Sequence, residues 1–443
     1  MNITFVQPYT HGRTTLRPLG LGYLASVLKK DHNITIIDSD VCKIPLEAVA
    51  KKALSTRPDI VGISANVLNK WTGVSLAEML KDSVKYIVFG GPEVTLSPEF
   101  FLTRENFYLL KGDAEKTLPL FIDFVNGGPI KKVKILSYLR DGKIINNELI
   151  ELEENLDNIP FPDTDLFEMD KYQVQLHGKK LTNIISSRGC PFKCIFCYSI
   201  LNKRFRQRSP QNIIDEMKML NKKYGYEAFK FFDDNFFMKK EFVQEFCEKL
   251  HKNRLSVYWQ CQGRVKHIDK DVLKMMYRAG CRRINLGVET GSPRSLKLLR
   301  KSSTVEANAR AIDLCRKAGI ETKSYLTVGY PWETKADVML TVNFLKKHPP
   351  TNIQTLIVFP FPNTELERMV REKGYKIDPN VLRGARDLDV PSYETENFTK
   401  DDLIKWRKLI IDTHKNATTP LLKRLAYKND FLVRTVRKLK TLT

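Results

Sequence analysis

The sequence has no apolar segment long enough to cross a membrane, because no uncharged hydrophobic run approaches the roughly 20 residues that span a bilayer. The first residues, MNITFVQPY, lack the basic stretch and apolar core of a secretory signal. The eight cysteines do not form a disulfide framework, since five of them are scattered along 443 residues. We therefore expect a cytoplasmic protein in a reducing compartment.

Acidic residues are fewer than basic ones, 51 against 73, so the formal net charge is +22. This excess favours a nucleic-acid or anionic-membrane partner, or simply lysines spread over the surface. Much of the excess is spread along the chain, and the stretch after His414 is an exception. There Asp430 is the only acid among eight basic residues: Lys415, Lys423, Arg424, Lys428, Arg434, Arg437, Lys438 and Lys440. One or two basic amphipathic helices are expected there. Such helices can lie on an anionic lipid surface or pack on the protein with their lysines in water.

Three cysteines stand close together after a strand-like run that starts at Leu181 and breaks at Arg188-Gly189. Cys190, Cys194 and Cys197 occupy eight residues, and thiolates at this spacing can converge on one soft metal centre. Zinc sites and complete iron–sulfur sites normally have four ligands. Three ligands favour a cubane cluster with one iron left open. The alternatives are a zinc site with a distant fourth ligand, or three core cysteines.

The stretch CPFKCIFC resembles the CxxxCxxC signature of the radical S-adenosylmethionine (SAM) enzymes, including the aromatic Phe196 before the last cysteine. The resemblance implies a [4Fe–4S] cluster held by Cys190, Cys194 and Cys197, with SAM on the open iron. One electron from the cluster then cleaves SAM to a 5′-deoxyadenosyl radical, which abstracts hydrogen from a substrate.

The first 125 residues alternate short apolar strands with helices, which predicts a doubly wound, Rossmann-like (flavodoxin-like) parallel sheet. Expected strands and helices cover 3–8, 18–30, 34–40, 45–55, 59–65, 74–82, 86–91 and 117–125. Ligands of such sheets bind at the carboxyl ends of the strands. The loops at those ends are 7–12, 64–69, 90–95 and 112–115.

This half resembles the cobalamin (B12)-binding domain found ahead of many radical SAM cores, through PLGLGYLASVL, PDIVGIS, FGGPEVT and KGDAEKTL. The resemblance implies a cobalamin site formed by the loop residues Ser64, Gly90, Gly91, Pro92, Gly112 and Glu115. No Asp-x-His-x-x-Gly stretch offers a lower cobalt ligand, and the isolated His11 is not proposed for that role. Related domains also exist that keep the fold and bind nothing.

From Leu181 the pattern repeats strand and helix six times, which predicts a partial (β/α)6 barrel with its chemistry at the strand carboxyl ends. The expected strands are 181–186, 228–233, 256–261, 283–288, 322–328 and 353–359, and the expected helices are 211–223, 239–252, 269–279, 293–317 and 334–347. We expect a cobalamin-binding-like domain over 1–130, a linker over 131–178, the barrel over 179–370 and a C-terminal region over 371–443.

Residues at the strand ends of this barrel are candidates for binding SAM. Their positions correspond to SAM-binding segments of the family, and Gly287 to Ser292 is similar to its Gly-x-Glu-Ser-Gly-Ser segment. The candidates are Phe196, Asp233, Asp234, Gln260, Arg264, Glu289 and Gly329. For Asp233 and Asp234 the alternative is a helix cap and a solvated acid.

A radical generator beside a cobalamin pocket suggests methyl transfer to an unactivated carbon. The alternatives are a cobalamin-containing cyclase or oxidoreductase without methyl transfer, and a basic RNA-binding protein, which would leave the cysteine loop unexplained. A methylthiotransferase needs a second cysteine triad, where this chain has only Cys42. We expect a small-molecule or lipid-like substrate, an external electron donor of the ferredoxin or flavodoxin type, and possible membrane contact through the tail. A nucleic-acid partner is not expected.

Overall fold

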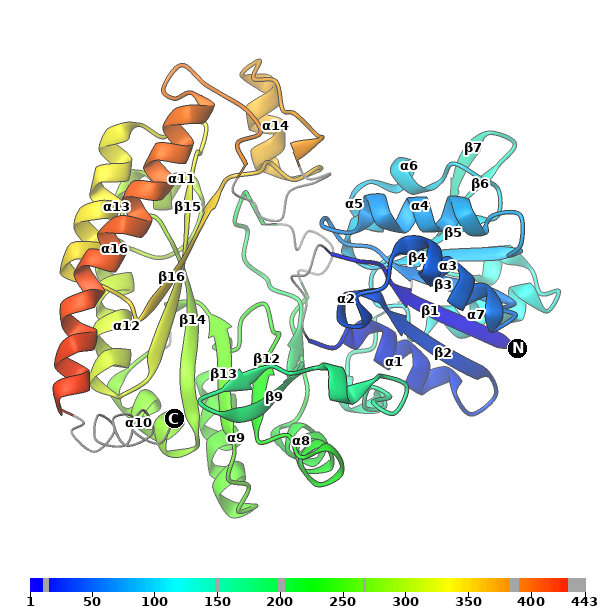
Figure 1. Ribbon diagram of the computed structural model, residues 1–443, viewed down its shortest axis with the longest axis horizontal. Helices are drawn as coiled ribbons and strands as arrows, with labels where there is room; N and C mark the ends of the chain where they lie inside the picture. The colour runs from blue at the N-terminus through cyan, green and yellow to red at the C-terminus, as the bar shows by residue number, and fades with distance from the viewer. Residues whose placement is uncertain (11–15, 148–151, 198–203, 266–267, 382–389, 429–443) are drawn as a thin grey trace, which may run out of the picture.

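The computed structural model describes residues 1–10, 16–147, 152–197, 204–265, 268–381 and 390–428. Two α/β bodies lie side by side, the first formed by the N-terminal third of the chain and the second by a strongly curled sheet (Figure 1). The concave side of the curled sheet faces the first body. No helix in the described ranges combines the length and the apolar character that a membrane crossing requires.

The first sheet has seven strands in the order β2-β1-β3-β4-β5-β6-β7. Strands β1 to β5 are parallel, and their Val- and Ile-rich residues are buried between two helical layers, as expected for a doubly wound sheet. The strands are β1 (Asn2–Gln7), β2 (Asn33–Asp38), β3 (Ile60–Ser64), β4 (Tyr86–Gly90), β5 (Phe107–Leu110), β6 (Leu136–Arg140) and β7 (Lys143–Asn146). The helices are α1 (Leu19–Leu28), α2 (Ser39–Cys42), α3 (Leu46–Ser55), α4 (Lys70–Leu80), α5 (Pro92–Leu96), α6 (Pro98–Phe101) and α7 (Thr117–Val125).

Three strands of this sheet were not predicted. Strand β5 has only four residues, too few for a periodic pattern. The antiparallel hairpin β6–β7 lies in the stretch expected to be a linker, and it extends the sheet beyond β5. Its turn is Asp141-Gly142, with φ angles of 49° and 70°. An Asp-Gly pair between two strands is a strong hairpin signal, so the sequence did contain the information.

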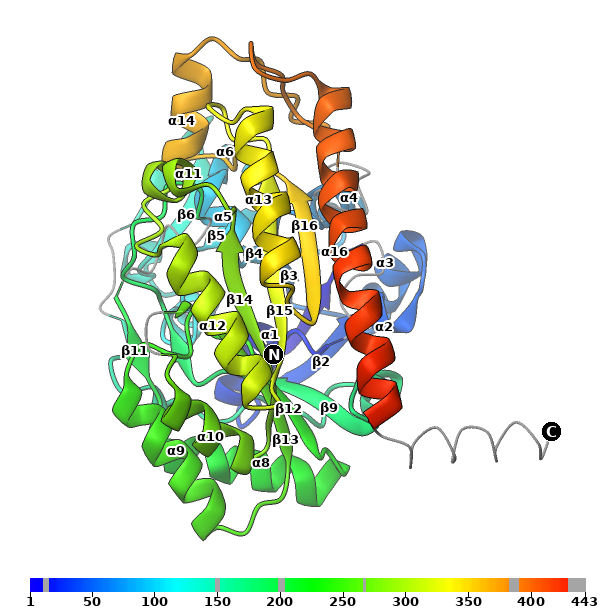
Figure 2. The same cartoon turned by 90° about the vertical axis from the view of Figure 1, so that its left-hand side faces the viewer.

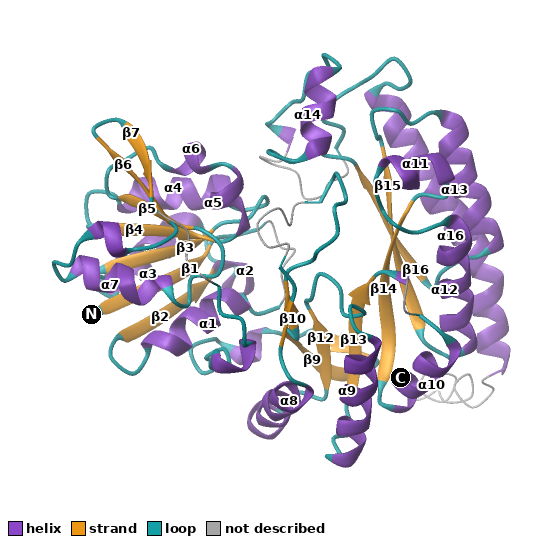
Figure 3. Cartoon of the chain, turned by 180° about the vertical axis from the view of Figure 1, so that it is seen from behind, coloured by secondary structure: helices purple, strands orange, loops and turns teal. Residues whose placement is uncertain are grey.

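The second sheet runs in the order β16-β15-β14-β13-β12-β9-β8 and curls into the predicted half-barrel (Figure 3). All its neighbouring strands are parallel except β8 and β9. The strands are β8 (Gln175–Leu176), β9 (Lys179–Ile184), β12 (Ala228–Phe231), β13 (Tyr258–Gly263), β14 (Cys281–Glu289), β15 (Glu321–Val328) and β16 (Asn352–Ile357). A short antiparallel pair, β10 (Ser187–Arg188) and β11 (Arg206–Gln207), follows β9 and leads into the cysteine loop.

Helices cover the convex side of the half-barrel and leave its concave side uncovered (Figures 1 and 2). They are α8 (Pro210–Tyr224), α9 (Lys240–Lys252), α10 (Lys270–Arg278), α11 (Pro293–Leu298), α12 (Val305–Lys317), α13 (Lys335–Lys347), α14 (Glu365–Glu372) and α16 (Lys400–Lys428). The single helix expected over 293–317 is in fact two. Arg300 and Ser302, with φ angles of 53° and 51°, break it.

The C-terminal helix α16 packs against α13 and β16 on the convex side (Figure 2). Leu403, Trp406 and Ile410 are buried in this contact, so up to residue 419 the helix follows the expectation that it packs on the protein. Residues 429–443, which carry the rest of the basic tail, lie outside the described residues.

Candidate active site between the two domains

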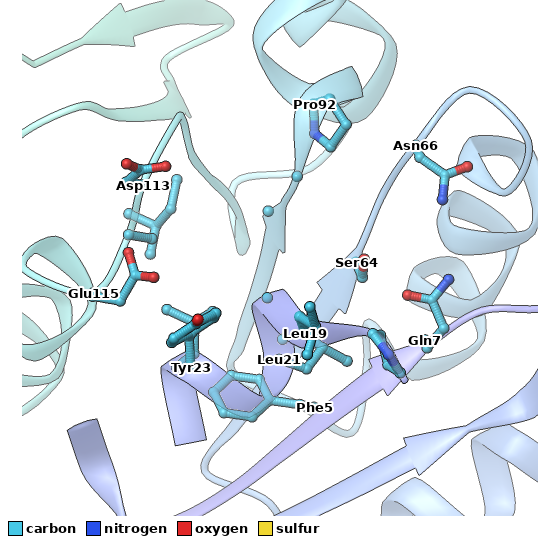
Figure 4. A pocket seen from close by; sticks show the side chains of 18 of the residues that line it. Phe5, Gln7, Leu19, Leu21, Tyr23, Ser64, Asn66, Pro92, Asp113 and Glu115 are labelled. Atoms are coloured by element: carbon cyan, nitrogen blue, oxygen red, sulfur yellow. The ribbon is translucent and has the colours of Figure 1, made fainter. Parts of the chain in front are cut away.

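A cavity of about 670 Å³ lies at the carboxyl edge of the first sheet (Figure 4), and residues at the start of the half-barrel also line it. Its walls contain all six residues that the sequence predicted for cobalamin: Ser64, Gly90, Gly91, Pro92, Gly112 and Glu115. The barrel contributes a second wall through Asn183, Ile185, Ser187, Arg188, Gly189, Phe232 and Asp234. The structure thus gathers the six residues in one cavity, and their contact with cobalamin stays a prediction.

Backbone forms part of the cavity wall at the end of β4. Gly91 has a φ of 107°, and a Cβ atom there would lie 2.5 Å from the carbonyl oxygen of Ala65. That carbonyl is fixed, because the Ala65 amide donates to Gly90 and its oxygen accepts from Glu93. Only glycine fits this position, and the β3 and β4 loops can therefore approach a large planar ligand closely.

Ion pairs join the two domains beside the cavity. Arg188, two residues before Cys190, donates a hydrogen bond to the carboxylate of Glu115 at 2.6 Å. It also lies 3.3 Å from the carboxylate of Asp113, and this carboxylate pairs with Arg206 at 2.6 Å. Burial disfavours the Arg188 charge, yet the attraction of Glu115 and Asp113 outweighs it and raises the pKa of Arg188. The Gly-Asp-Ala-Glu turn therefore docks on the barrel, and Glu115 uses one oxygen for this contact.

The cysteine loop follows Arg188 and is anchored at its centre. The Ile195 amide donates to Leu299 at 3.3 Å, and the Ile195 oxygen accepts from Leu366 at 3.0 Å. The Ile195 side chain is buried, whereas Cys190, Cys194 and Cys197 around it are half-buried. The backbone is thus held on the barrel side while the thiols remain accessible.

The donor set of this loop, three thiols and no nearby histidine, is of the kind that holds an iron–sulfur cluster. The thiolates of a cubane cluster bind different irons, so they lie further apart than the ligands of one tetrahedral ion. Arg264 donates from Nη1 to the Cys194 sulfur at 3.3 Å, a contact that stabilises a thiolate.

Asp233 does not present its carboxylate to the site, in contrast to the prediction that it binds SAM. Its Oδ1 accepts from the amides of Ser186 at 2.7 Å and Ser187 at 2.8 Å, and its Oδ2 accepts from the Ser186 hydroxyl at 2.6 Å. Burial raises the pKa of the Asp233 carboxyl to about 6, although these hydrogen bonds oppose the rise. Asp233 thus fixes the chain ahead of the cysteine loop, while the exposed Asp234 lies on the cavity wall.

Gln260 on β13 and Arg264, which directly follows this strand, were both predicted to bind SAM. Gln260 is buried on the concave face of the sheet, in register with Lys230 and Arg283. Arg264 follows the strand, with its guanidinium 4.0 Å from the Phe192 ring centre. Its Nη2 is buried and has no hydrogen-bond partner among the described residues. A buried guanidinium nitrogen without a partner is expected to meet an acceptor on a ligand.

Glu289 ends β14 at a bulge, with a φ of 64°, and is buried as predicted. Its Oε1 pairs with the Lys301 ammonium at 2.5 Å, and both side chains lie over Gly287, where a Cβ atom would clash with them. Lys301 also lies 5.7 Å from the Phe196 ring centre. The sequence analysis missed Lys301, because only the break between α11 and α12 turns it into the site.

Gly329 forms a turn at the end of β15, with a φ of 100°. Its amide donates to Oε2 of Glu333 at 2.6 Å, and its oxygen accepts from the Tyr393 hydroxyl. Tyr330 beside it stacks on Trp332 with ring centres 5.4 Å apart. Burial raises the pKa of Glu333 to about 8, although backbone hydrogen bonds from Gly329 and Tyr330 oppose the rise.

The raised pKa of Glu333 predicts a pH-dependent stability. A carboxyl that titrates near 8 in the folded chain and near 4.5 in the unfolded chain costs stability as pH rises between these values, by up to about 1.4 kcal/mol per pH unit. Glu333→Gln keeps an acceptor for the Gly329 amide and cannot ionise. We expect the variant to gain stability relative to the wild type from pH 5 to 8 in urea unfolding. A difference that does not change with pH would contradict this assignment.

Comparisons with known proteins find matches for both of these bodies. Residues 184–345 match the model of the radical SAM superfamily, and residues 11–122 match that of the B12 binding domain. An uncharacterized methyltransferase, PH0819 of Pyrococcus horikoshii, is 32% identical over 424 residues, covering 91% of this chain and 90% of its own. An anaerobic magnesium-protoporphyrin IX monomethyl ester cyclase of Rubrivivax gelatinosus is 27% identical, covering 85% and 71%.

Solved structures share the fold. The cobalamin-dependent SAM radical enzyme OxsB, solved with aqua-cobalamin and SAM bound, aligns with a TM-score of 0.77 at 19% identity, over 92% of this chain and 65% of that one. A loop with three cysteines for a cubane cluster, next to a second cofactor cavity between two α/β domains, is the arrangement of a cobalamin-dependent radical SAM enzyme. The chain belongs to the radical SAM superfamily and carries a B12 binding domain ahead of its radical SAM domain. Its cofactors are a [4Fe–4S] cluster, SAM and cobalamin.

Proposed function

We propose that the chain is a cobalamin-dependent methyltransferase that replaces a hydrogen on an unactivated carbon of a small molecule with a methyl group. Such a carbon has no acidic proton, so general-base catalysis cannot reach it and a radical is required. The observation that carries the proposal is the shared wall of the two cofactor sites. Arg188 and Gly189 line the cavity of the B12 binding domain, and Cys190 is the next residue.

When bound, the cluster supplies the electron that cleaves SAM to the 5′-deoxyadenosyl radical, and cobalamin supplies the methyl group. Cys190, Cys194 and Cys197 hold the cluster. For SAM we propose that the unpaired Nη2 of Arg264 binds the carboxylate and that Asp234 faces the ammonium group. Phe196, Gln260, Glu289 and Gly329 then surround the rest of the molecule. The loops around Gly91 hold cobalamin.

The overall reaction consumes a substrate C–H bond, two SAM molecules and two electrons from an external donor of the ferredoxin or flavodoxin type. It yields the methylated product and one molecule each of S-adenosylhomocysteine, methionine and 5′-deoxyadenosine, and the two electrons balance the charges of the two sulfonium groups. The hydrogen atom leaves with 5′-deoxyadenosine. The role of the chain is to hold the reactive centres in line and to exclude water from the radical.

A substrate-independent measurement tests the proposal. The reconstituted protein, loaded with reduced cobalamin, is mixed with excess SAM, and S-adenosylhomocysteine is followed by chromatography. We expect a rapid burst of one S-adenosylhomocysteine per bound cobalamin, because methyl transfer from SAM to cobalamin precedes the radical step. Protein loaded with the cluster alone gives the background. Formation of 5′-deoxyadenosine without any burst would contradict methyl transfer.

A second candidate function is radical cyclisation or oxidation without methyl transfer. It is favoured by the similarity to the Rubrivivax gelatinosus cyclase, which extends over 85% of this chain. A cyclase of this kind would form 5′-deoxyadenosine without the burst. The same experiment therefore separates the two functions. Contact of the C-terminal tail with an anionic membrane stays a prediction.

A further inference from the structure

The concave face of the half-barrel carries a group of cations with too few counter-charges. Lys230 on β12, Gln260 on β13 and Arg283 on β14 are neighbours in register, and Arg283 is next to Glu321 on β15. Lys323 follows two residues later on β15. Neighbouring residues of parallel strands point to the same face, so these side chains share one surface.

The opposite, convex face of the same strands is apolar, so the cationic side chains must point to the concave face. Phe229, Phe231 and Trp259 alternate with Lys230 and Gln260 along their strands and are fully buried among aromatic side chains beneath the helices. The cations are only partly buried, since they line the uncovered inside of the curl.

The cations outnumber the carboxylates around them. Glu321 is the acid in register with this group, and it already pairs with Arg283 at 2.7 Å and His177 at 3.5 Å. Within the part of the chain that the structure describes, neither Lys230 nor Lys323 has a carboxylate at ion-pair distance. The Lys230 ammonium lies 4.5 Å from the ring centre of Phe232, and the Lys323 ammonium lies 5.5 Å from that of Tyr325.

The pKa values of both lysines also indicate that their positive charges lack a counter-charge. Burial, together with the charges of Lys323 and Arg283, lowers the pKa of Lys230 to about 8. Burial also lowers the pKa of Lys323. Partly buried cations of this kind are costly unless an anion accompanies them.

We propose that Lys230, Arg283 and Lys323 bind an anionic group, a carboxylate or a phosphate, of the small molecule on which the enzyme acts. That the bound molecule is the substrate rests on the proposed function, whereas the anion site itself rests on the geometry of the three cations. Asn183, the register neighbour of Lys230 on β9, also lines the cavity between the domains. A molecule anchored by its anionic end at Lys230 therefore extends toward the cofactors. The site selects a substrate that carries an anionic group.

The first test needs neither turnover nor a variant. The full chain, loaded with cluster and cobalamin, receives a pulse of acetic anhydride at pH 8, and peptides are analysed by mass spectrometry. At this pH about half of a lysine with a pKa near 8 is the reactive neutral amine. We expect pyrophosphate or succinate at constant ionic strength to slow labelling of Lys230 and Lys323 at least about fivefold, and to leave the exposed Lys297 unchanged. Protection by SAM alone would assign the cations to SAM and overturn the proposal.

The second test is calorimetric titration of the same two anions. The double variant K230Q/K323Q is expected to bind the tighter anion at least about tenfold more weakly than the wild type. The matched variant K297Q/K346Q removes the same charge from exposed positions on α11 and α13 and should bind like the wild type. Equal binding by all three proteins, without protection of Lys230, would overturn the site. Because no SAM is cleaved, this failure is distinct from absence of the S-adenosylhomocysteine burst.

Discussion

Cys194→Ala is expected to abolish SAM cleavage, with a fall in 5′-deoxyadenosine formation of more than about 1,000-fold, since loss of even an outer-shell partner of a metal site costs about 10–100-fold. Cys194 is one of three thiols available to the cluster, and its sulfur accepts a hydrogen bond from Arg264. With two thiolates left, a second iron of the cubane loses its protein ligand. Iron and acid-labile sulfide should fall together with activity.

Cys42→Ser is the matched control for this variant. Cys42 is also a half-buried free thiol, but it lies in the N-terminal domain and contacts Glu168 at 3.1 Å. Its loss should leave iron, sulfide and 5′-deoxyadenosine formation at wild-type levels. If Cys194→Ala retained a full complement of iron and cleaved SAM, the assignment of the cysteine loop would be wrong.

Gly91→Val is expected to weaken cobalamin binding by at least about 100-fold and to destabilise the N-terminal domain by about 2–4 kcal/mol. The new Cβ would lie 2.5 Å from the Ala65 oxygen, and the φ of 107° is one that a β-branched residue avoids. Both the β3 and β4 loops must then shift. Equilibrium dialysis of hydroxocobalamin and urea unfolding measure the two effects.

Gly127→Ala separates backbone strain from the clash at the cavity. Gly127 has a similar φ of 101°, but a Cβ atom there meets nothing within 4 Å, and the residue is remote from the cavity wall. We expect a loss of about 1 kcal/mol and unchanged cobalamin affinity, because strain alone has this magnitude. A Gly91 variant that bound cobalamin as tightly as Gly127→Ala would show that the glycine loops do not form the site.

The sequence predicted those parts of the site that depend on spacing along the chain. Cys190, Cys194 and Cys197 are local in sequence, and the Gly91 loop follows a recognisable parallel strand. Because parallel strands bring their carboxyl ends to one edge, residues of the loops 64–69, 90–95 and 112–115 could be assigned to one cavity before the structure was known. The half-barrel followed from strand and helix alternation for the same reason.

Side-chain pairings between distant segments could not be predicted. Asp233 was expected to face SAM, but its carboxylate is used by the chain around Ser186, a contact that depends on how β9 and β12 pair. Lys301 reaches Glu289 only because the helix breaks at Arg300. The cationic group around Lys230 also depends on strand register. In each case the residue type was visible in the sequence, whereas its partner was set by tertiary packing.

Electron paramagnetic resonance of the reduced, anaerobically reconstituted chain, recorded before and after SAM is added, tests the open iron most directly. If Cys190, Cys194 and Cys197 leave one iron free, we expect a [4Fe–4S]⁺ signal whose g-values shift when SAM binds that iron, and no shift with 5′-deoxyadenosine, which lacks the amino and carboxylate groups, at equal concentration. A cluster signal that SAM leaves unchanged, or a reconstituted chain without a cluster signal, would contradict it.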